Sequence, residues 1–277
     1  MKTSRQVPPP SWADRPHSLG KLPSIFRSVK VLAQLLHGWL SFAKSGTPDL
    51  AHDPPPQLLL RAKRLQNLSR ILLQHLRMEV RVTGPLPPPH CAGLQVTNHV
   101  SFADILVLSS LHPTVFVAKS EVASWPIIGP IAAASGTIFI QRERRTDVAR
   151  ANAALQCAIQ AGLRVTLFPE GTSSNGQAVL PFQPALLQPA LRTGADITPA
   201  FLEYLNPDGS RVDEIAYFGD RHLQDCLWAL ISRKSTLARV HFGPSRPPDG
   251  DRKSLAQSLH EEVSALGRRA SNSPQNP

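Results

Sequence analysis

The chain has 277 residues, and 42% of them are hydrophobic, which allows a sizeable core and excludes a chain that is disordered throughout. Lysine and arginine outnumber aspartate and glutamate by 30 to 20, and residues 1–80 alone hold 12 basic against 4 acidic residues. A basic end of this kind predicts an anionic partner, either a membrane surface or a nucleic acid. The three cysteines are widely spaced and form no zinc or redox motif, which favours reduced thiols in a cytosolic protein.

The first residues predict a flexible arm followed by an amphipathic helix. Residues 1–22 are polar and proline-rich, without the pattern of a signal peptide. Residues 24–43 form a helical repeat with two faces: Ile25, Val29, Leu32, Leu36 and Leu40 on the apolar one, and Arg27, Lys30, Gln34, His37 and Ser41 on the polar one. Charges interrupt the repeat too often for a membrane span of about 20 largely apolar residues. The helix suits the bilayer interface, and packing on the protein's own core is the alternative.

A second basic helix is predicted over residues 57–77, after a proline-rich linker at 44–56. Its apolar side consists of Leu58, Leu65, Leu68, Leu72 and Leu76. Two such helices in succession favour a membrane-associating segment over residues 23–77, with an anionic membrane surface as the partner. Nucleic acid is the competing partner. We expect none, because no aromatic residues alternate with the charges and no zinc-finger or RNP pattern is present.

From residue 79 onward, short apolar strands alternate with helices. The predicted strands are 79–82, 94–96, 115–118, 137–140, 165–168, 197–202, 214–218 and 238–242, and the predicted helices are 101–111, 127–134, 147–161, 184–193, 223–232 and 253–266. This alternation predicts an α/β fold with a central, mostly parallel sheet flanked by helices, preceded by the basic helical pair. One large domain should span residues 78–267, and the polar residues 268–277 are expected to be a disordered tail.

The stretch Thr97-Asn98-His99-Val100-Ser101-Phe102-Ala103-Asp104 carries the first candidate site. It lies between a strand and a helix, with Ser101 placed to cap the helix and Asp104 three residues later, as in a capping box. On one continuous helix His99 and Asp104 would lie about 140° apart. If the helix begins only at Ser101, His99 can fold back so that the carboxylate holds one ring nitrogen and leaves the other free as a base.

Three further stretches end strands on functional side chains. Gly136-Thr-Ile-Phe139-Ile-Gln-Arg142 ends on a cation, and Phe168-Pro-Glu170-Gly171-Thr172 ends on an acidic turn. A run at 197–200 contains Pro199, which predicts an edge strand or a bent one. Taken singly, each has an ordinary explanation, because arginines after strands are usually solvated and such turns are usually only turns.

Together, and in this order, these stretches resemble the glycerolipid acyltransferase family of the lysophosphatidate acyltransferase type. The family's blocks correspond to Asn98, His99, Ser101 and Asp104; to Gly136, Phe139 and Arg142; to residues 168–172; and to the run with Pro199. The resemblance covers about residues 60 to 245, which makes 78–267 an acyltransferase domain. Its implied reaction moves a fatty acyl group from an acyl thioester to a hydroxyl of a lysolipid, in membrane lipid biosynthesis.

The resemblance also implies the roles of the residues. His99 and Asp104 are the expected catalytic pair, since an imidazole with a reference pKa near 6.5 suits proton removal at neutral pH. The expected substrate-binding residues are Asn98, Ser101, Gly136, Arg142, Glu170, Gly171 and Thr172. No metal or cofactor is expected; acyl-CoA or acyl-carrier protein would be the donor substrate. The enzyme is expected at the cytoplasmic face of the membrane, as a peripheral or monotopic protein.

One departure from the family pattern concerns the headgroup of the acceptor. Many members that make phosphatidate continue the third block with arginine, where this chain has Ser173. This difference, and the sequence around Tyr217-Phe218-Gly219-Asp220, resembles the branch that acylates lyso-ornithine lipid. Two other classes remain open: a hydrolase, although no Gly-x-Ser-x-Gly motif is present, and a non-catalytic membrane-binding module.

Overall fold

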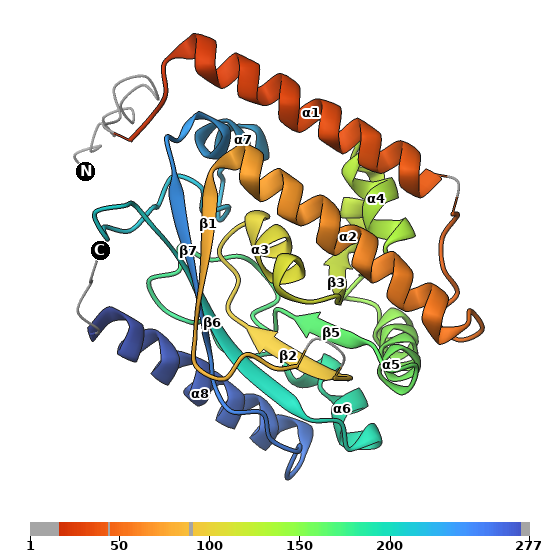
Figure 1. Ribbon diagram of the computed structural model, residues 1–277. Coiled ribbons are helices and arrows are strands. Elements are labelled where there is room, and N and C mark those ends of the chain that lie inside the picture. The colour runs from red at the N-terminus through yellow and green to blue at the C-terminus, as the bar shows by residue number, and fades with distance from the viewer. Residues whose placement is uncertain (1–16, 44, 89–90, 273–277) are drawn as a thin grey trace, which may run out of the picture.

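The computed structural model describes residues 17–43, 45–88 and 91–272, which form a seven-stranded sheet with helices on both faces (Figure 1). The strands are β1 (Met78–Thr83), β2 (Gly93–Thr97), β3 (Val115–Lys119), β4 (Ile138–Ile140), β5 (Arg164–Leu167), β6 (Ile197–Leu205) and β7 (Thr236–Phe242). Their order is β1-β7-β6-β2-β5-β3-β4, and every neighbouring pair is parallel except β6 and β7. The prediction of a mostly parallel α/β sheet is therefore confirmed.

The helices divide between the two faces of the sheet. They are α1 (Lys21–Ala43), α2 (Pro55–Leu76), α3 (Ala103–Leu111), α4 (Ile128–Ala134), α5 (Arg145–Gln160), α6 (Gln188–Thr193), α7 (Leu223–Ser232) and α8 (Arg252–Asn272), with 3-10 turns at Ser120–Ser124 and Pro184–Leu186. Helices α1, α2, α3, α4 and α7 contribute to the hydrophobic cluster on one face, and α5, α6 and α8 to the cluster on the other. The strands alternate between the clusters, so that on β6 Leu202 and Tyr204 face the first and Phe201 the second.

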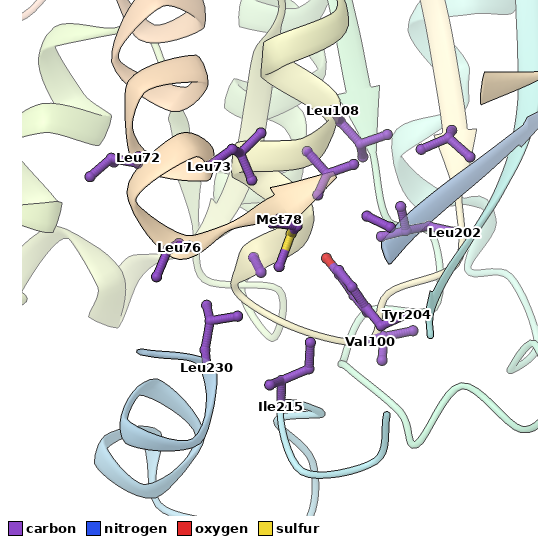
Figure 2. Packing of buried hydrophobic residues seen from close by; sticks show 14 of the residues in the cluster. Leu72, Leu73, Leu76, Met78, Val100, Leu108, Leu202, Tyr204, Ile215 and Leu230 are labelled. Atoms are coloured by element: carbon purple, nitrogen blue, oxygen red, sulfur yellow. The ribbon is translucent and has the colours of Figure 1, made fainter. Parts of the chain in front are cut away.

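Helix α2 belongs to the same core as the sheet. Leu72, Leu73 and Leu76 of α2 pack with Met78 of β1 and Leu202 of β6 (Figure 2). All five leucines of its predicted apolar side are less than 7% exposed. The proposed separation of a membrane segment at 23–77 from a domain beginning at residue 78 is therefore wrong for α2, because its apolar side covers α3 and the sheet.

Helix α1 lies outside α2, where it also contacts α4 and α7 (Figure 1). Its inner side is narrow, and the buried side chains there include Arg27, Val31 and Phe42. Arg27, predicted on the solvated polar face, instead donates hydrogen bonds to the carbonyl oxygens of Ile231 and Arg233 at the end of α7. The large apolar side chains point outward and are 37% to 70% exposed: Leu22, Ile25, Phe26, Val29, Leu32, Leu36, Trp39 and Leu40. Within the described ranges, no helix combines the length and apolar character needed to cross a bilayer.

Two predicted strand features are corrected by the sheet topology. Residues 214–218 are not a strand, because their backbone groups bond to the loop after β2: Tyr217 N–H donates to the Val100 carbonyl and the Ser101 hydroxyl donates to the Ile215 carbonyl. The run with Pro199 is part of β6, an interior strand. The proline is tolerated there because β6 pairs with β7 only from Ala200 onward.

The predicted arm and tail are shorter than the sequence indicates. Residues 17–19 already pair with the connection between α7 and β7, through a hydrogen bond from Lys234 N–H to the His17 carbonyl and a β-bridge between Ser18 and Arg233. At the other end, α8 continues to Asn272, and Ala270 is 2% exposed. The predictions of a flexible arm at 17–22 and of disorder at 268–272 are thus wrong, and their remaining parts, 1–16 and 273–277, lie outside the described residues.

Candidate active site

The catalytic candidates lie on the turn between β2 and α3. Strand β2 ends at Thr97, and α3 begins at Ala103, two residues after the predicted start. The hydroxyl of Ser101 accepts a hydrogen bond from Ala103 N–H at 3.3 Å, so it helps to begin the helix although it is not the residue directly before it. Residues 98–102 are therefore free to fold over the first turn of α3.

His99 and Asp104 form the predicted pair. Nδ1 of His99 lies 2.7 Å from Oδ2 of Asp104, and the same oxygen accepts the N–H groups of Val100 at 2.8 Å and Ser101 at 3.1 Å. Asp104 is completely buried, whereas 24% of the His99 side chain is exposed. The imidazole stacks on Phe168 with 4.1 Å between ring centroids. With Nδ1 held by the carboxylate, Nε2 is the nitrogen left to act as a base on a bound hydroxyl.

Tyr204 is a contact of the site that the sequence reasoning missed. It lies on β6, and its hydroxyl donates a 2.7 Å hydrogen bond to Oδ1 of Asp104, the oxygen that does not face His99. The ring lies between Val100 and Leu202 with the hydroxyl directed inward (Figure 2). Burial, and then the negative charge of Asp104, raise the pKa of Tyr204 well above its usual value. The predicted strand ended at residue 202, two residues before Tyr204, and nothing in the sequence indicated its partner, which lies 100 residues away.

Arg142 follows β4 and is the predicted anion-binding cation. Its guanidinium donates to the carbonyl of Gly171, and among the described residues it makes no ion pair with a carboxylate. Burial lowers the pKa of Arg142. Gly171 has φ +79°, and a Cβ there would lie 2.6 Å from Nη1 of Arg142, so glycine is required both by the backbone and by this contact.

Glu170 was predicted to bind substrate, but it does not line the cavity beside His99. It instead supports the turn that carries His99. Its Oε1 accepts the backbone N–H of His99 at 2.9 Å, and the residue is 6% exposed. Burial raises the pKa of Glu170 to about 7, against the lowering effect of the hydrogen bond from His99. The acidic side chain of the third block is therefore a structural partner of His99.

Three other predicted substrate-binding residues have structural roles. Asn98 bridges β2 to β6, donating to the Leu202 carbonyl at 2.9 Å and accepting Leu202 N–H at 2.7 Å. Ser101 is completely buried beneath the 214–218 loop. Gly136 makes the turn before β4 with φ +95°. None of the three lines the cavity beside His99, because each side chain or turn is used to hold the strands in place.

A cavity of about 570 Å³ opens beside His99 and continues beneath α1. Its polar lining includes His99, Lys119, Arg142, Thr172 and Ser173, and Gly171 lines it as well. Three of the predicted substrate-binding residues, Arg142, Gly171 and Thr172, therefore lie at this cavity. Its apolar lining comes from five helices: Val31 and Leu35 of α1, Leu65, Leu68, Leu72 and Leu76 of α2, Ile105 and Leu106 of α3, Ile128 and Ile131 of α4, and Leu223, Leu227, Leu230 and Ile231 of α7. The cavity thus joins the imidazole of His99 and a cation to an extensive apolar lining.

The continuation of the third block is occupied by internal contacts. The hydroxyl of Ser173 donates to the Tyr217 carbonyl, and Ser174 N–H donates to the His99 carbonyl at 2.8 Å. The hydroxyl of Ser174 also donates to the His99 carbonyl, at 3.3 Å, so both serine hydroxyls already have partners within the protein. In the part of the chain that the structure describes, no group of three or more His, Cys, Asp or Glu side chains is placed to hold a metal ion.

Comparisons with known proteins agree with this arrangement. The family described as Acyltransferase matches residues 79–203. A 1-acyl-sn-glycerol-3-phosphate acyltransferase of Neisseria meningitidis is 34% identical over 74% of this chain and 81% of its own, and a lyso-ornithine lipid O-acyltransferase of Rhizobium meliloti is 40% identical over 70% and 71%. The crystal structure of a 1-acyl-sn-glycerophosphate acyltransferase from Thermotoga maritima shares the fold, with a TM-score of 0.61 at 18% identity over 90% of this chain and 100% of that one. The chain belongs to the Acyltransferase family and is an O-acyltransferase of membrane lipid synthesis.

Proposed function

We propose that the enzyme transfers a fatty acyl group from an acyl thioester, acyl-CoA or acyl-carrier protein, to the hydroxyl of a lysolipid of the 1-acylglycerol-3-phosphate type. The observation that carries the proposal is the His99–Asp104 pair at the polar end of an apolar cavity that also contains Arg142. The relative from Neisseria meningitidis is named for this acceptor, which supports the choice, whereas the relative from Rhizobium meliloti is named for lyso-ornithine lipid.

In the proposed reaction, Nε2 of His99 takes the proton of the acceptor hydroxyl while its oxygen attacks the thioester carbonyl carbon. The new carbon–oxygen bond forms, the carbon–sulfur bond breaks, and the leaving thiolate takes the proton back from the imidazolium. Asp104 stabilises the imidazolium through Nδ1. Because the acceptor attacks directly, the step requires neither a protein nucleophile nor a metal or cofactor.

The two ends of the cavity suit the two kinds of substrate group. The apolar part of the cavity fits a fatty acyl chain, whose transfer from water is favoured by about 0.8 kcal/mol per methylene. Arg142 is half-buried, pairs with no carboxylate among the described residues, and suits the anionic group of an acceptor through charge-assisted hydrogen bonds. This assignment places the hydroxyl beside His99 and the headgroup at the mouth.

Membrane association is proposed for the outer face of α1 rather than for both helices. Its eight exposed large apolar side chains would enter the headgroup region, with Lys21 and Lys30 near the lipid phosphates. Helix α2 was predicted to meet the membrane through its basic residues, but three of its arginines make internal bonds: Arg61 to the Ala134 carbonyl, Arg64 to the Ser45 hydroxyl and Arg70 to the Ser110 carbonyl. We place the enzyme at the cytoplasmic face as a peripheral or monotopic protein, where anionic lipids would attract the remaining cations.

The test is acyl transfer by the purified enzyme with labelled acyl-CoA or acyl-carrier protein, with and without lysophosphatidate in mixed micelles. Lysolipid-dependent product formation is expected, and His99→Gln should reduce it by about 10²-fold or more. Thioester cleavage that proceeds equally without lysolipid would instead establish a hydrolase. Product formation that survives His99→Gln would remove His99 as the base.

A lyso-ornithine lipid is the second candidate acceptor, favoured by one observation. Among the described residues that line the cavity, the positively charged side chains are those of Lys119 and Arg142, and Lys119 is exposed to solvent. A phosphomonoester dianion is best met by more than one cation or by a nest of amides, whereas a less charged headgroup is satisfied by one. Direct competition between both acceptors for one acyl donor separates the two candidates.

A further inference from the structure

The carboxylate of Asp104 is a fully buried anion with unequal surroundings for its two oxygens. Oδ2 accepts three hydrogen bonds, from Nδ1 of His99 and from two N–H groups of the turn. Oδ1 accepts the hydroxyl of Tyr204, which belongs to the same hydrophobic cluster as Val100, Leu202 and Ile215. A buried charge without hydrogen-bond partners is strongly disfavoured, so the Tyr204 hydroxyl stabilises the ionised carboxylate at Oδ1.

The direction of this hydrogen bond is fixed by charge. An ionised carboxylate can only accept, so Tyr204 must donate its proton. Burial and the adjacent charge raise the pKa of Tyr204 well above its usual range, which keeps the phenol protonated across the range in which imidazoles ordinarily titrate. The donated proton draws negative charge toward Oδ1, away from the oxygen that faces the imidazole.

We propose that Tyr204 is a positioning residue that sets the proton affinity of His99 through Asp104. The inference rests on the proposed role of His99 as the base. Other charged or titratable groups at this site are Glu170, which accepts the His99 N–H, and Lys119 and Arg142 of the cavity lining, and the tests below leave all three unchanged. Tyr204 does not line the cavity, so it acts on the imidazole only through the carboxylate. The hydrogen bond from Tyr204 reduces the negative charge on the Asp104 oxygen that faces His99. His99 therefore binds a proton less tightly and remains available as a base at lower pH.

The experiment is the isosteric substitution Tyr204→Phe, followed by the pH dependence of kcat for acyl transfer. Three donors remain on Oδ2, so the carboxylate stays against His99. Without the hydrogen bond from residue 204, its negative charge is greater on Oδ2 and binds the proton of the His99 imidazolium more tightly. The acid limb of the profile should move to higher pH by about half a unit. KM for both substrates should stay within about twofold, since no lining side chain changes. An acid limb that stays in place or moves to lower pH overturns the proposal, whatever the value of kcat.

A matched control removes another buried hydroxyl from the same layer of the protein. Thr166 on β5 is completely buried, and its hydroxyl lies 2.8 Å from that of Thr114, away from Asp104. Thr166→Val should leave the acid limb unchanged. An equal displacement in Thr166→Val and Tyr204→Phe would assign the effect to a general change in packing and overturn the proposal.

A second test varies the donor strength of the Tyr204 hydroxyl and does not depend on the folding of the Tyr204→Phe variant. The chain contains two tyrosines, Tyr204 and Tyr217. In a Tyr217→Phe parent, replacement of tyrosine by fluorotyrosine changes Tyr204 alone and makes its hydroxyl a stronger donor. The acid limb should then move to lower pH than in the parent, opposite to the effect of phenylalanine. Movement to higher pH, or none, would overturn the proposal.

A measurement without turnover separates this inference from the proposed reaction. The NMR titration midpoint of the His99 ring, assigned by its loss in His99→Gln, should rise in Tyr204→Phe. In an Asp104→Asn background, the same substitution should no longer move it, because the carboxylate that connects the two residues is gone. An equal movement in both backgrounds would show a route that bypasses Asp104 and refute the inference even if acyl transfer is confirmed.

Discussion

The buried carboxyl of Glu170 makes the stability of the enzyme depend on pH in a way that one substitution should remove. Burial raises the pKa of Glu170 from 4.5 to about 7, and the residue holds the backbone N–H of His99 at 2.9 Å. A folded-state pKa above the unfolded one means that the folded protein binds the proton more tightly. The stabilisation is therefore complete below about pH 4.5 and is lost as the pH rises through 7.

The magnitude follows from the same two values. Moving a pKa from 4.5 to about 7 corresponds to roughly 3 kcal/mol in the free energy of unfolding between the two protonation states. Glu170→Gln keeps an oxygen that can accept from His99 N–H but cannot ionise. Relative to wild type, this variant should gain roughly 3 kcal/mol between pH 4.5 and pH 8, because only the wild type must bury an anion as the pH rises.

The assay is urea unfolding of wild type and Glu170→Gln, measured side by side at half-unit steps from pH 4.5 to 8. Each comparison is made at one pH, so groups common to both proteins cancel. Glu203→Gln is the matched control, since Glu203 is also 6% exposed. Burial raises the pKa of Glu203, but its bonds with His241 and Arg239 lower it overall. Stability from Glu203 is therefore present above pH 4.5 and lost only at lower pH, so its curve should run parallel to wild type in this window. Parallel curves for Glu170→Gln would refute the reasoning.

Three further outcomes are expected. Asp104→Glu keeps an acid in the first turn of α3 but moves it relative to His99, so kcat should fall about 10²-fold while the protein stays folded; near-normal transfer would reduce Asp104 to a helix cap. Ser173→Arg places a cation at the cavity and should shift acceptor preference toward lysophosphatidate. Ser173→Ala loses the same bond to the Tyr217 carbonyl and should leave the preference unchanged. Equal changes of acceptor preference in both variants would refute the headgroup argument. Phe26→Ser combined with Leu40→Ser should weaken binding to both acidic and neutral vesicles in a sedimentation assay, and unchanged binding would exclude the outer face of α1 as the lipid contact.

Local patterns in the sequence were sufficient for most elements of the fold. Strands β2, β3, β5 and β7 lie within a few residues of their predicted bounds, because apolar segments of four to seven residues between turn signals have few other stable arrangements. The catalytic turn was predictable for a similar reason. His99 and Asp104 are five residues apart, and a helix that begins after Ser101 leaves little freedom for how they meet.

Contacts between distant segments were beyond this kind of reasoning. Residues 214–218 have the composition of a strand, yet their hydrogen bonds go to Val100 and Ser101 in the loop after β2. Glu170 followed a strand into a turn, which suggested a substrate contact, whereas its partner is the backbone of His99. The hydrogen-bond partners of these residues depend on which groups lie nearest in space, and the spacing of residues in the sequence does not indicate this.

The two N-terminal helices show why amphipathicity alone does not tell which side of a helix faces the protein. Both have an apolar and a basic side, yet α2 turns its leucines inward while α1 turns its large apolar side chains outward. The difference follows from what each helix covers. Helix α2 lies directly on α3 and the core, whereas α1 lies on helices that already cover the core, and its Arg27 satisfies two carbonyl oxygens at the end of α7. Within the described residues, this outer helix is anchored by its polar side and leaves its apolar side exposed, and the proposed lipid surface would cover it. Because α1 and α7 also line the cavity, the same arrangement would place the apolar part of the cavity next to that surface.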